Sequence, residues 1–292
     1  MSKPFLRYVK FILKFILSKL SHDDKFSLVR FLLPEISAAD RLWLARSLLP
    51  ELDYAENWNN TDPNTNGEYW LLQKVAPRCS IVCDVGAHVG NWTNACLMAN
   101  PNVHIYAFEA SPPTQEQFSR RFASAPNVHL LRVGLGDESA MLKFYDHGTG
   151  SGLSGFFSRE LSVGKEPQQV IQVACAPLDD LPEFANKTID FLKIDTEGSE
   201  MRVLRGSKTL LAQKRIRLIQ FEYGGTWIDA KEFLADAFHF FKQLGYSFGR
   251  LFPKDIQWIS NFDHRKLENY KYSNYVACAS YEDMVALGLE ND

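Results

Sequence analysis

Two apolar runs end in charged side chains that can do chemistry. The segment DFLKIDTEGSE places Lys193 and Asp195 two residues apart, so a strand would carry both on one face. The segment IRLIQFEYGG ends a second apolar run with Glu222. A buried charge is costly unless it is paired, and a carboxylate beside a substrate can take a proton from a hydroxyl. We therefore predict Asp195 or Glu222 as a general base, with Lys193 as the neighbour of Asp195.

Further carboxylates near Asp195 leave a second chemistry open. Glu197 and Glu200 stand at the start of a predicted helix, where negative charge suits the helix dipole. We count Glu197 among the catalytic candidates. Asp195, Glu197 and Glu222 could instead bind Mg²⁺ through oxygen ligands, and the metal would then help to ionise a hydroxyl. A structural ion pair with helix capping is the plainer alternative, and the histidines show no paired spacing typical of metal ligands.

A glycine turn follows the short apolar run in IVCDVGAHVG. Gly86 and Gly90 let the main chain approach a ligand closely, and a helix starting at Asn91 offers unpaired N–H groups. His88, inside the turn, can contact a cofactor or substrate, or support the turn from behind. The NAD fingerprint GxGxxG needs glycines where this chain has His88 and Asn91, and a P-loop lysine is missing. The turn predicts a cofactor site, with a plain strand-to-helix turn as the alternative.

Two more acids stand where a nucleoside could bind. Glu109 ends the run HIYAFEA, about 20 residues beyond the glycine turn, where a carboxylate can accept hydrogen bonds from both ribose hydroxyls. Asp137, in the segment VGLGDES, can accept from an adenine amino group or hold a turn.

Alternating strand and helix patterns from Ser80 onward would bring these residues together. The pattern predicts βαβ units and a parallel sheet of seven strands, with ligands bound at the carboxyl ends of the strands. The expected strands are 81–84, 103–108, 128–133, 189–194, 216–222, 245–250 and 274–280, and the expected helices are 91–99, 113–123, 199–212 and 230–243. The loop 148–157, rich in Gly and Ser, is expected to cover the cleft or contact the substrate.

The segments before this region predict three divisions of the chain. Residues 1–55 form a helical annex, residues 56–79 a linker and a helix that leads into the sheet, and residues 80–292 the main α/β domain. Residues 3–20 have lysines and arginine on one helical face and apolar residues on the other. Such a helix suits the surface of an anionic membrane, or packing against another helix or a second subunit in a homo-oligomer.

The amino-acid composition limits which binding partners and which cellular compartment we expect. The 292 residues include 32 basic and 35 acidic side chains, a net charge of −3, so no overall surplus of charge favours nucleic acid. Five cysteines without a CxxC pair indicate neither a disulfide framework nor a zinc site. We expect a cytoplasmic protein, with peripheral contact at the inner face of the membrane as an alternative.

The segments DVGAHVG, FEA, GLGD, DFLKIDTEGSE and QFE together resemble the FkbM family of S-adenosylmethionine-dependent methyltransferases, from about residue 80 to residue 280. KIDTEGSE is the most specific of these motifs. The resemblance implies a class I methyltransferase fold (Rossmann-like), with seven strands of which the last is antiparallel, and O-methylation of a hydroxyl on a sugar, glycan or polyketide-type metabolite. It also implies S-adenosyl-L-methionine as cofactor. Where the family commonly has asparagine, this chain has His88.

The resemblance also assigns positions around the cofactor. It implies that Asp84, Gly86, Gly90 and Glu109 bind the cofactor and that Asp137 lies near its adenine. His88, Asn91 and Ala110 are their neighbours in the same two motifs, and we include them in the predicted cofactor site.

Two other functions stay open at this point. One is a nucleotide-dependent oxidoreductase or epimerase on a similar sheet, which the missing glycines disfavour. The other is a non-catalytic scaffold that binds an adenosyl ligand and is recruited to a membrane or partner, which the combination of Glu109, Asp195 and Glu222 disfavours. The acceptor and the methylated position do not follow from the sequence, because acceptor pockets are built from loops.

Overall fold

We analysed a computed structural model of the chain, which describes residues 56–148, 151–159, 164 and 166–290. Internal contacts divide the chain into two units, of which the second, Asn60–Asp292, carries the sheet and the predicted site. The predicted annex (1–55) and its amphipathic segment (3–20) lie outside the described residues.

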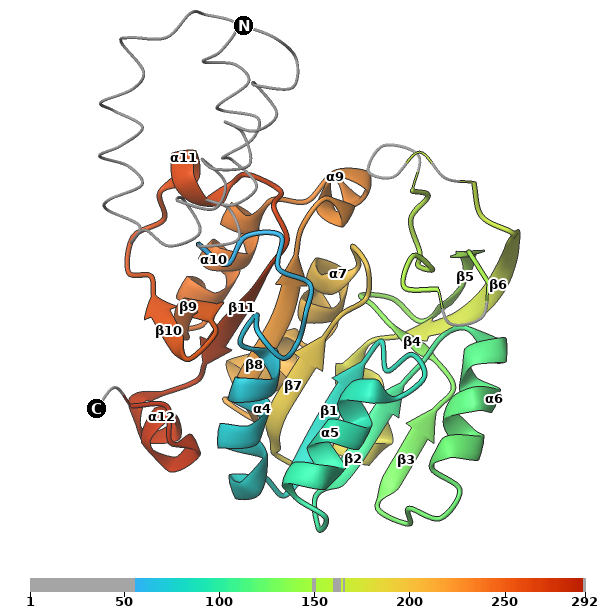
Figure 1. The fold of residues 1–292 in the computed structure, drawn as a ribbon, viewed down its shortest axis with the longest axis horizontal. Helices are drawn as coiled ribbons and strands as arrows, with labels where there is room; N and C mark the ends of the chain where they lie inside the picture. Colours follow the sequence, from blue (N-terminus) through green and yellow to red (C-terminus); the bar gives the residue numbers. More distant parts are fainter. Residues whose placement is uncertain (1–55, 149–150, 160–163, 165, 291–292) are drawn as a thin grey trace, which may run out of the picture. The chain divides into compact units, whose positions relative to one another are not determined.

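The described unit alternates strands and helices along the chain (Figure 1). The strands are β1 (Ile81–Val85), β2 (His104–Phe108), β3 (Val128–Leu131), β4 (Gly134–Leu135), β5 (Ala140–Asp146), β6 (Gln169–Ala176), β7 (Ile189–Ile194), β8 (Ile216–Tyr223), β9 (Ser247–Phe252), β10 (Asp255–Trp258) and β11 (Ser273–Cys278). The helices are α4 (Glu68–Val75), α5 (Asn91–Ala99), α6 (Pro112–Arg121), α7 (Glu200–Arg205), α8 (Lys208–Ala212), α9 (Thr226–Ala230), α10 (Leu234–Gln243), α11 (His264–Leu267) and α12 (Tyr281–Leu287).

The main sheet has the order β10-β9-β11-β8-β7-β1-β2-β3. Strands β1, β2, β3, β7 and β8 pair in parallel, whereas β11 is antiparallel to both β8 and β9. The predicted α/β fold with a mainly parallel sheet and an antiparallel last strand is confirmed. The predicted number of seven strands is wrong, because the chain folds back after β9 and adds β10 at the edge, where Ile256 is buried.

Two predicted helices are interrupted. The helix expected over 199–212 divides into α7 and α8 at Gly206, where a Cβ atom would lie 1.8 Å from the backbone oxygen of Gly136. This close crossing of two backbones leaves no room for a continuous helix with a side chain there. The helix expected over 230–243 is likewise preceded by the separate short helix α9.

A smaller sheet, of order β4-β6-β5, lies between β3 and β7 in sequence. The sequence analysis did not predict strands β5 and β6. Their pairing is antiparallel, from Ala140 opposite Cys175 to Asp146 opposite Gln169.

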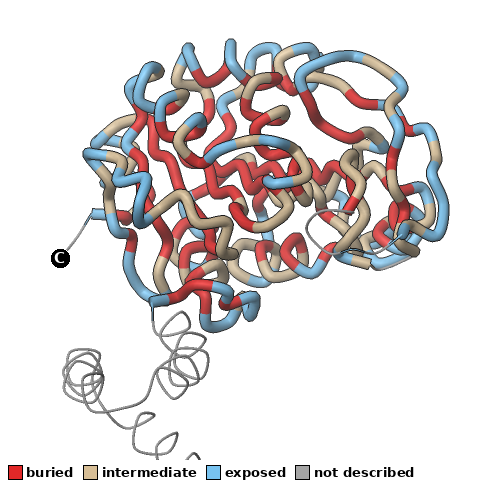
Figure 2. The backbone as a smooth tube through the Cα atoms, turned by 90° about the horizontal axis from the view of Figure 1, so that it is seen from above, coloured by how far each residue is buried: buried red, intermediate tan, exposed pale blue. Residues whose placement is uncertain are grey.

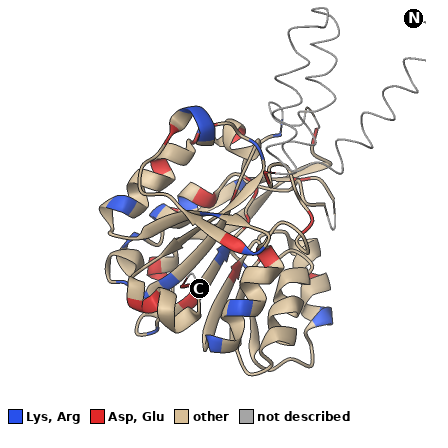
Figure 3. Cartoon of the chain, turned by 60° about the vertical axis from the view of Figure 1, so that its left-hand side comes forward, with Lys and Arg blue, Asp and Glu red and all other residues tan. Residues whose placement is uncertain are grey.

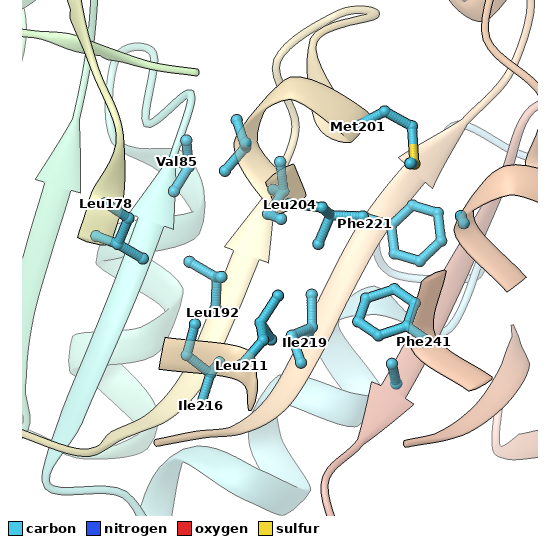
Figure 4. Packing of buried hydrophobic residues seen from close by; sticks show 14 of the residues in the cluster. Val85, Leu178, Leu192, Met201, Leu204, Leu211, Ile216, Ile219, Phe221 and Phe241 are labelled. Carbon is cyan, nitrogen blue, oxygen red and sulfur yellow. The ribbon is translucent and has the colours of Figure 1, made fainter. Parts of the chain in front are cut away.

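Buried side chains cover both faces of the main sheet, and the tube in Figure 2 shows the buried segments running through the middle of the described unit. On one face, α4 and α5 pack against Val82, Phe191 and Leu218. On the other, Phe221 of β8 lies among side chains of α7 and α10, and its ring centroid is 6.0 Å from that of Phe241 (Figure 4). This rigid double-faced sheet positions the ends of β1, β2, β7 and β8.

Positive and negative side chains are interspersed over the described helices and loops (Figure 3). Within the part of the chain that the structure describes, none of the helices combines the length and the apolar character needed to cross a bilayer.

Candidate active site

The turn between β1 and α5 is packed against two neighbouring strands. Gly86, His88 and Gly90 have positive φ angles of 77°, 52° and 81°. The backbone N–H of Gly86 donates to the carbonyl of Phe108 at 3.0 Å. A Cβ atom on Gly86 would lie 1.8 Å from the backbone oxygen of Asp195, so glycine is required at this crossing. The turn therefore lies directly beside the end of β7, which carries the predicted catalytic residues.

Glu109 is bound by this turn and by the start of α6. Its two carboxylate oxygens accept hydrogen bonds from the backbone N–H groups of His88, at 2.8 Å, and Ser111, at 2.7 Å. Burial raises the pKa of Glu109, and these backbone hydrogen bonds oppose the shift. A carboxylate oxygen can accept more than one hydrogen bond, so Glu109 can still accept from ligand hydroxyls.

A cleft with a volume of about 150 Å³ opens beside Glu109. It is bounded by the ends of β1 and β2, by β4, and by the start of the segment after β7. Six predicted site residues line it: Gly86, His88, Glu109, Ala110, Asp195 and Glu197. The other six do not: Asp84, Gly90, Asn91, Lys193, Glu222 and Asp137.

Asp84 and Lys193 form a buried pair behind the cleft. The carboxylate of Asp84 accepts from the hydroxyl of Thr93 at 2.6 Å and lies 3.6 Å from Lys193 Nζ. Burial raises the pKa of Asp84, while Lys193 opposes the rise. This carboxylate links β1 to α5 and pairs with the lysine, and it does not line the cleft; its predicted contact with the cofactor stays a prediction.

Lys193 joins that pair to the cleft, since its Nζ also lies 3.1 Å from the carboxylate of Asp195. Burial alone would lower the pKa of Lys193, but the carboxylates of Asp195, Asp84 and Glu68 raise it overall. The lysine is therefore a permanent cation. It forms an ion pair with Asp195, whose side chain is 33% exposed.

Glu222 lies next to Asp195 and is hydrogen-bonded to it. Burial, followed by the charge of Asp195, raises the pKa of Glu222 well above its ordinary value. Glu222 thus favours its protonated form, in which it can donate a hydrogen bond to Asp195, because two adjacent carboxyl groups disfavour ionisation of both. It does not line the cleft, and its role as a general base stays a prediction.

Glu197 faces the cleft from a strained backbone position with φ of 58°. Its carboxylate is 2.5 Å from the guanidinium of Arg159, which is fully buried and also donates to the carbonyl of Leu153. Burial, followed by the charge of Asp195, raises the pKa of Glu197 to about 8 even though Arg159 opposes the shift. The Arg159–Glu197 pair ties the segment 151–159 over the cleft, where Ser151, Gly152, Ser154 and Phe156 form part of the wall.

Gly90 and Asn91 support the glycine turn from the side of α6. A Cβ atom on Gly90 would lie 2.3 Å from the ring of Phe122. The guanidinium of Arg121 donates to the carbonyl of Val89 at 2.9 Å and to the side chain of Asn91 at 2.7 Å. α5 begins at Asn91, as predicted.

Asp137 is bound to arginines away from the cleft. It accepts from Arg202 at 2.7 Å and from Arg205 at 3.4 Å. Although partial burial opposes the change, the hydrogen bond and charge of Arg202 and the charge of Arg205 lower the pKa of Asp137. Asp137 is not among the residues that line the cleft, and its predicted contact with the adenine stays a prediction.

The alternative of a Mg²⁺ site at Asp195, Glu197 and Glu222 is not supported. Among the residues that the structure describes, no group of three His, Cys, Asp or Glu side chains is arranged to hold a metal ion. The physical reason lies in the partners of these acids. Asp195 is paired with an ammonium group, Glu197 with a guanidinium, and Glu222 retains a proton.

The sequence analysis missed an acid that reaches this region from α4. Glu68 accepts a hydrogen bond from the Gln220 amide at 3.0 Å, and that amide also donates to Asn274 of β11 at 3.2 Å. Burial, opposed by Lys193 and reinforced by Asp195 and Asp84, raises the pKa of Glu68 to about 7. Gln220, a polar residue inside an apolar strand, was the available signal.

A comparison with known protein families identifies the family of the chain. Residues 84–248 match the model of the methyltransferase FkbM domain. The chain belongs to the FkbM methyltransferase family. The match covers the glycine turn, Glu109 and the strands β7 and β8, whereas Glu68 lies before it.

Curated relatives share part of the chain. Methyltransferase 1 from Beauveria bassiana is 31% identical over 149 residues, which are 44% of this chain and 59% of the relative. Hexuronic acid methyltransferase AglP from Haloferax volcanii is 25% identical over 169 residues, 57% of this chain and 66% of the relative. The chain thus spans about three-fifths to two-thirds of the length of these relatives.

Among solved structures, methyltransferase FkbM from Methylobacillus flagellatus superposes with a TM-score of 0.44 at 14% identity, covering 68% of this chain and 44% of that one.

Proposed function

We propose that this FkbM-family protein is an S-adenosylmethionine-dependent O-methyltransferase that acts on a hydroxyl of a sugar, glycan or polyketide-type metabolite. The observation that carries the proposal is one cleft that places a glycine turn, the doubly bound carboxylate of Glu109 and the lysine-paired carboxylate of Asp195 side by side. Family membership supports methyl transfer as the reaction class.

The residues of the cleft suit this cofactor. Gly86 lets the backbone approach a ligand, and Glu109 presents two acceptor oxygens suited to a ribose. Asp195 and Glu197 line the same cleft and would favour a positive charge beside them. When bound, S-adenosylmethionine supplies a methyl group on a sulfonium ion.

Asp195 is the proposed general base for the acceptor hydroxyl. It is the carboxylate of the buried cluster that lines the cleft, and Lys193 and Glu222 bind it from behind. These two partners hold the side chain of Asp195 in place. Alignment of the acceptor with the methyl group accounts for much of the rate in a displacement of this kind.

A carbohydrate acceptor is supported by the relative AglP, whose name specifies a hexuronic acid. The test is mass spectrometry of glycans, lipids and small metabolites from cells with and without the gene. We expect one class of molecule to lose a single methyl group when the gene is deleted. Unchanged masses across glycans and metabolites, with a methyl group lost from a protein or nucleic acid instead, would contradict the proposal.

A further inference from the structure

Carboxyl groups from four elements surround one ammonium group behind the cleft. Lys193 Nζ lies 3.1 Å from Asp195 and 3.6 Å from Asp84 of β1. Glu68 of α4 accepts a hydrogen bond from Gln220, which lies opposite Lys193 in the pairing of β7 and β8, and its charge acts on the same ammonium. Glu222 of β8 is hydrogen-bonded to Asp195. Three carboxyl groups therefore act on Lys193 and a fourth is bound to one of them, and we call these four residues the carboxyl cluster.

The carboxyl cluster has to hold protons at neutral pH, because four ionised carboxylates around one lysine would leave an excess of three negative charges in a largely buried space. Glu222 retains its proton. Glu68 is the member whose pKa, about 7, makes it exchange a proton near neutrality. The titratable groups that face Glu68 are Asp84, Lys193, Asp195, Tyr69 and Tyr272.

The position of Glu68 is determined by close backbone packing. The N–H of Glu68 donates to the side chain of Asn66 at 2.9 Å. Gly67, which precedes it, has a φ of 103°, and a Cβ atom there would lie 2.2 Å from the backbone oxygen of Phe252. The start of α4 is therefore locked against the end of β9, and the carboxylate of Glu68 is held beside Gln220.

We propose that the carboxyl cluster exchanges a proton for the positive charge of the methyl donor, and that Glu68 is the residue that releases this proton when the donor binds. The inference rests on the proposed function, because it requires a sulfonium ligand in the cleft. Asp195 connects the two places, since it lines the cleft and is paired with Lys193 inside the carboxyl cluster. An added positive charge in the cleft favours the ionised form of every carboxyl group near it.

The exchange balances over one turnover. Methyl transfer forms a bond from the acceptor oxygen to the methyl carbon and breaks the carbon–sulfur bond, whose electron pair stays on sulfur. The positive charge disappears from the cleft while the hydroxyl loses its proton. Asp195 receives that proton, and the carboxyl cluster regains the charge that it had before the donor bound. Glu68 acts through Asp195 and Lys193, so it is a positioning residue that compensates charge.

The test is calorimetric titration of the full chain at pH 7 with S-adenosylmethionine and with S-adenosylhomocysteine. Each titration is run in two buffers of different ionisation enthalpy, which gives the number of protons released. The two ligands share their amino acid and nucleoside groups, so the difference between them isolates the sulfonium charge. We expect S-adenosylmethionine to release about half a proton more, because a group with a pKa near the pH is half protonated. The difference should shrink at pH 5, where Glu68 stays protonated.

Two variants locate the proton. Glu68→Gln should bind both ligands and lose about half a proton of the difference in proton release; any remainder would come from Glu197, which lines the cleft and has a pKa of about 8. Glu116→Gln, which removes a surface carboxylate paired with Arg132, should keep it. Equal proton release by both ligands in the wild type would overturn the proposal, and so would an undiminished difference in Glu68→Gln. The wild-type comparison needs no variant and still tests the exchange of a proton for the sulfonium charge if Glu68→Gln does not fold. If neither ligand binds, the proposed function itself fails, and the inference falls with it.

Discussion

Glu109 and Asp195 line the same cleft, but different kinds of group hold their carboxylates in place. Glu109 is held by two backbone N–H groups, which belong to the turn and to the start of a helix. Asp195 is held by other ionisable side chains, namely Lys193 and Glu222, which come from inside β7 and from β8. Backbone groups do not titrate, whereas Asp195 belongs to a cluster of ionisable side chains in which Glu68 has a pKa of about 7. We therefore expect changes near Glu109 to alter folding and cofactor affinity, and changes near Asp195 to alter turnover and proton balance.

The largest effect is expected from Asp195→Asn. It should lower methyl transfer by about 100-fold or more, because it removes the proposed base, while affinity for S-adenosylhomocysteine stays within about threefold. The measurement is transfer of a labelled methyl group to extracts of the host cell, beside a calorimetric titration. Near-normal transfer by this variant would remove Asp195 from the catalytic role, and Glu116→Gln serves as the control that should behave as wild type.

Next comes Gly86→Ala, which tests whether the turn depends on its backbone contact. Its Cβ would lie 1.8 Å from the oxygen of Asp195, and its φ is positive, so we expect a loss of about 3 kcal/mol or more in the free energy of unfolding. Gly164→Ala is the matched control. Gly164 also has a positive φ, but none of the described residues has an atom within 4 Å of a Cβ there, and its substitution should cost about 1 kcal/mol. Equal losses in denaturant unfolding would contradict the close crossing.

The same contrast explains what the sequence could predict. Gly86 and Glu109 belong to short contiguous motifs in a strand–turn–helix order, and the structure brings both to the cleft. Asp195 also follows from its strand pattern. Glu68 could not be found in this way, because its meeting with Gln220 joins residues 152 positions apart. The ion pair of Asp137 could not be predicted, because it depends on where Arg202 lies in the fold. Strand β10 could not be predicted either, because it forms only if the chain turns back after Phe252.

A smaller effect concerns stability and pH at Glu68. The pKa of this carboxyl is about 7 in the fold, against an ordinary value of 4.5. Between these pH values the folded chain keeps a proton that the unfolded chain releases, so this group lowers the free energy of unfolding as pH rises from about 4.5 to 7. Glu68→Gln should therefore gain about 1–3 kcal/mol over wild type at pH 8 relative to pH 5. Urea unfolding at both pH values measures it, and a constant difference would show that Glu68 does not titrate there.

The smallest effect is expected from Asp137→Asn. The carboxylate is bound by Arg202 and Arg205, both partly exposed, so the loss in stability should be about 0.5–1 kcal/mol. Affinity for S-adenosylhomocysteine should stay unchanged within about twofold, as measured by calorimetry. A loss of about tenfold or more would return Asp137 to the adenine contact that the sequence predicts.

The most direct test of the cofactor site is a calorimetric titration of the wild-type chain with S-adenosylhomocysteine and with NADH, repeated with Glu109→Gln. We expect the wild type to bind S-adenosylhomocysteine and not NADH. Glu109→Gln should weaken that binding by about 10-fold or more, because an amide cannot accept from both backbone N–H groups and from two ribose hydroxyls. Binding of NADH in preference, or no binding of S-adenosylhomocysteine, would contradict the assignment of this cleft to a methyl donor.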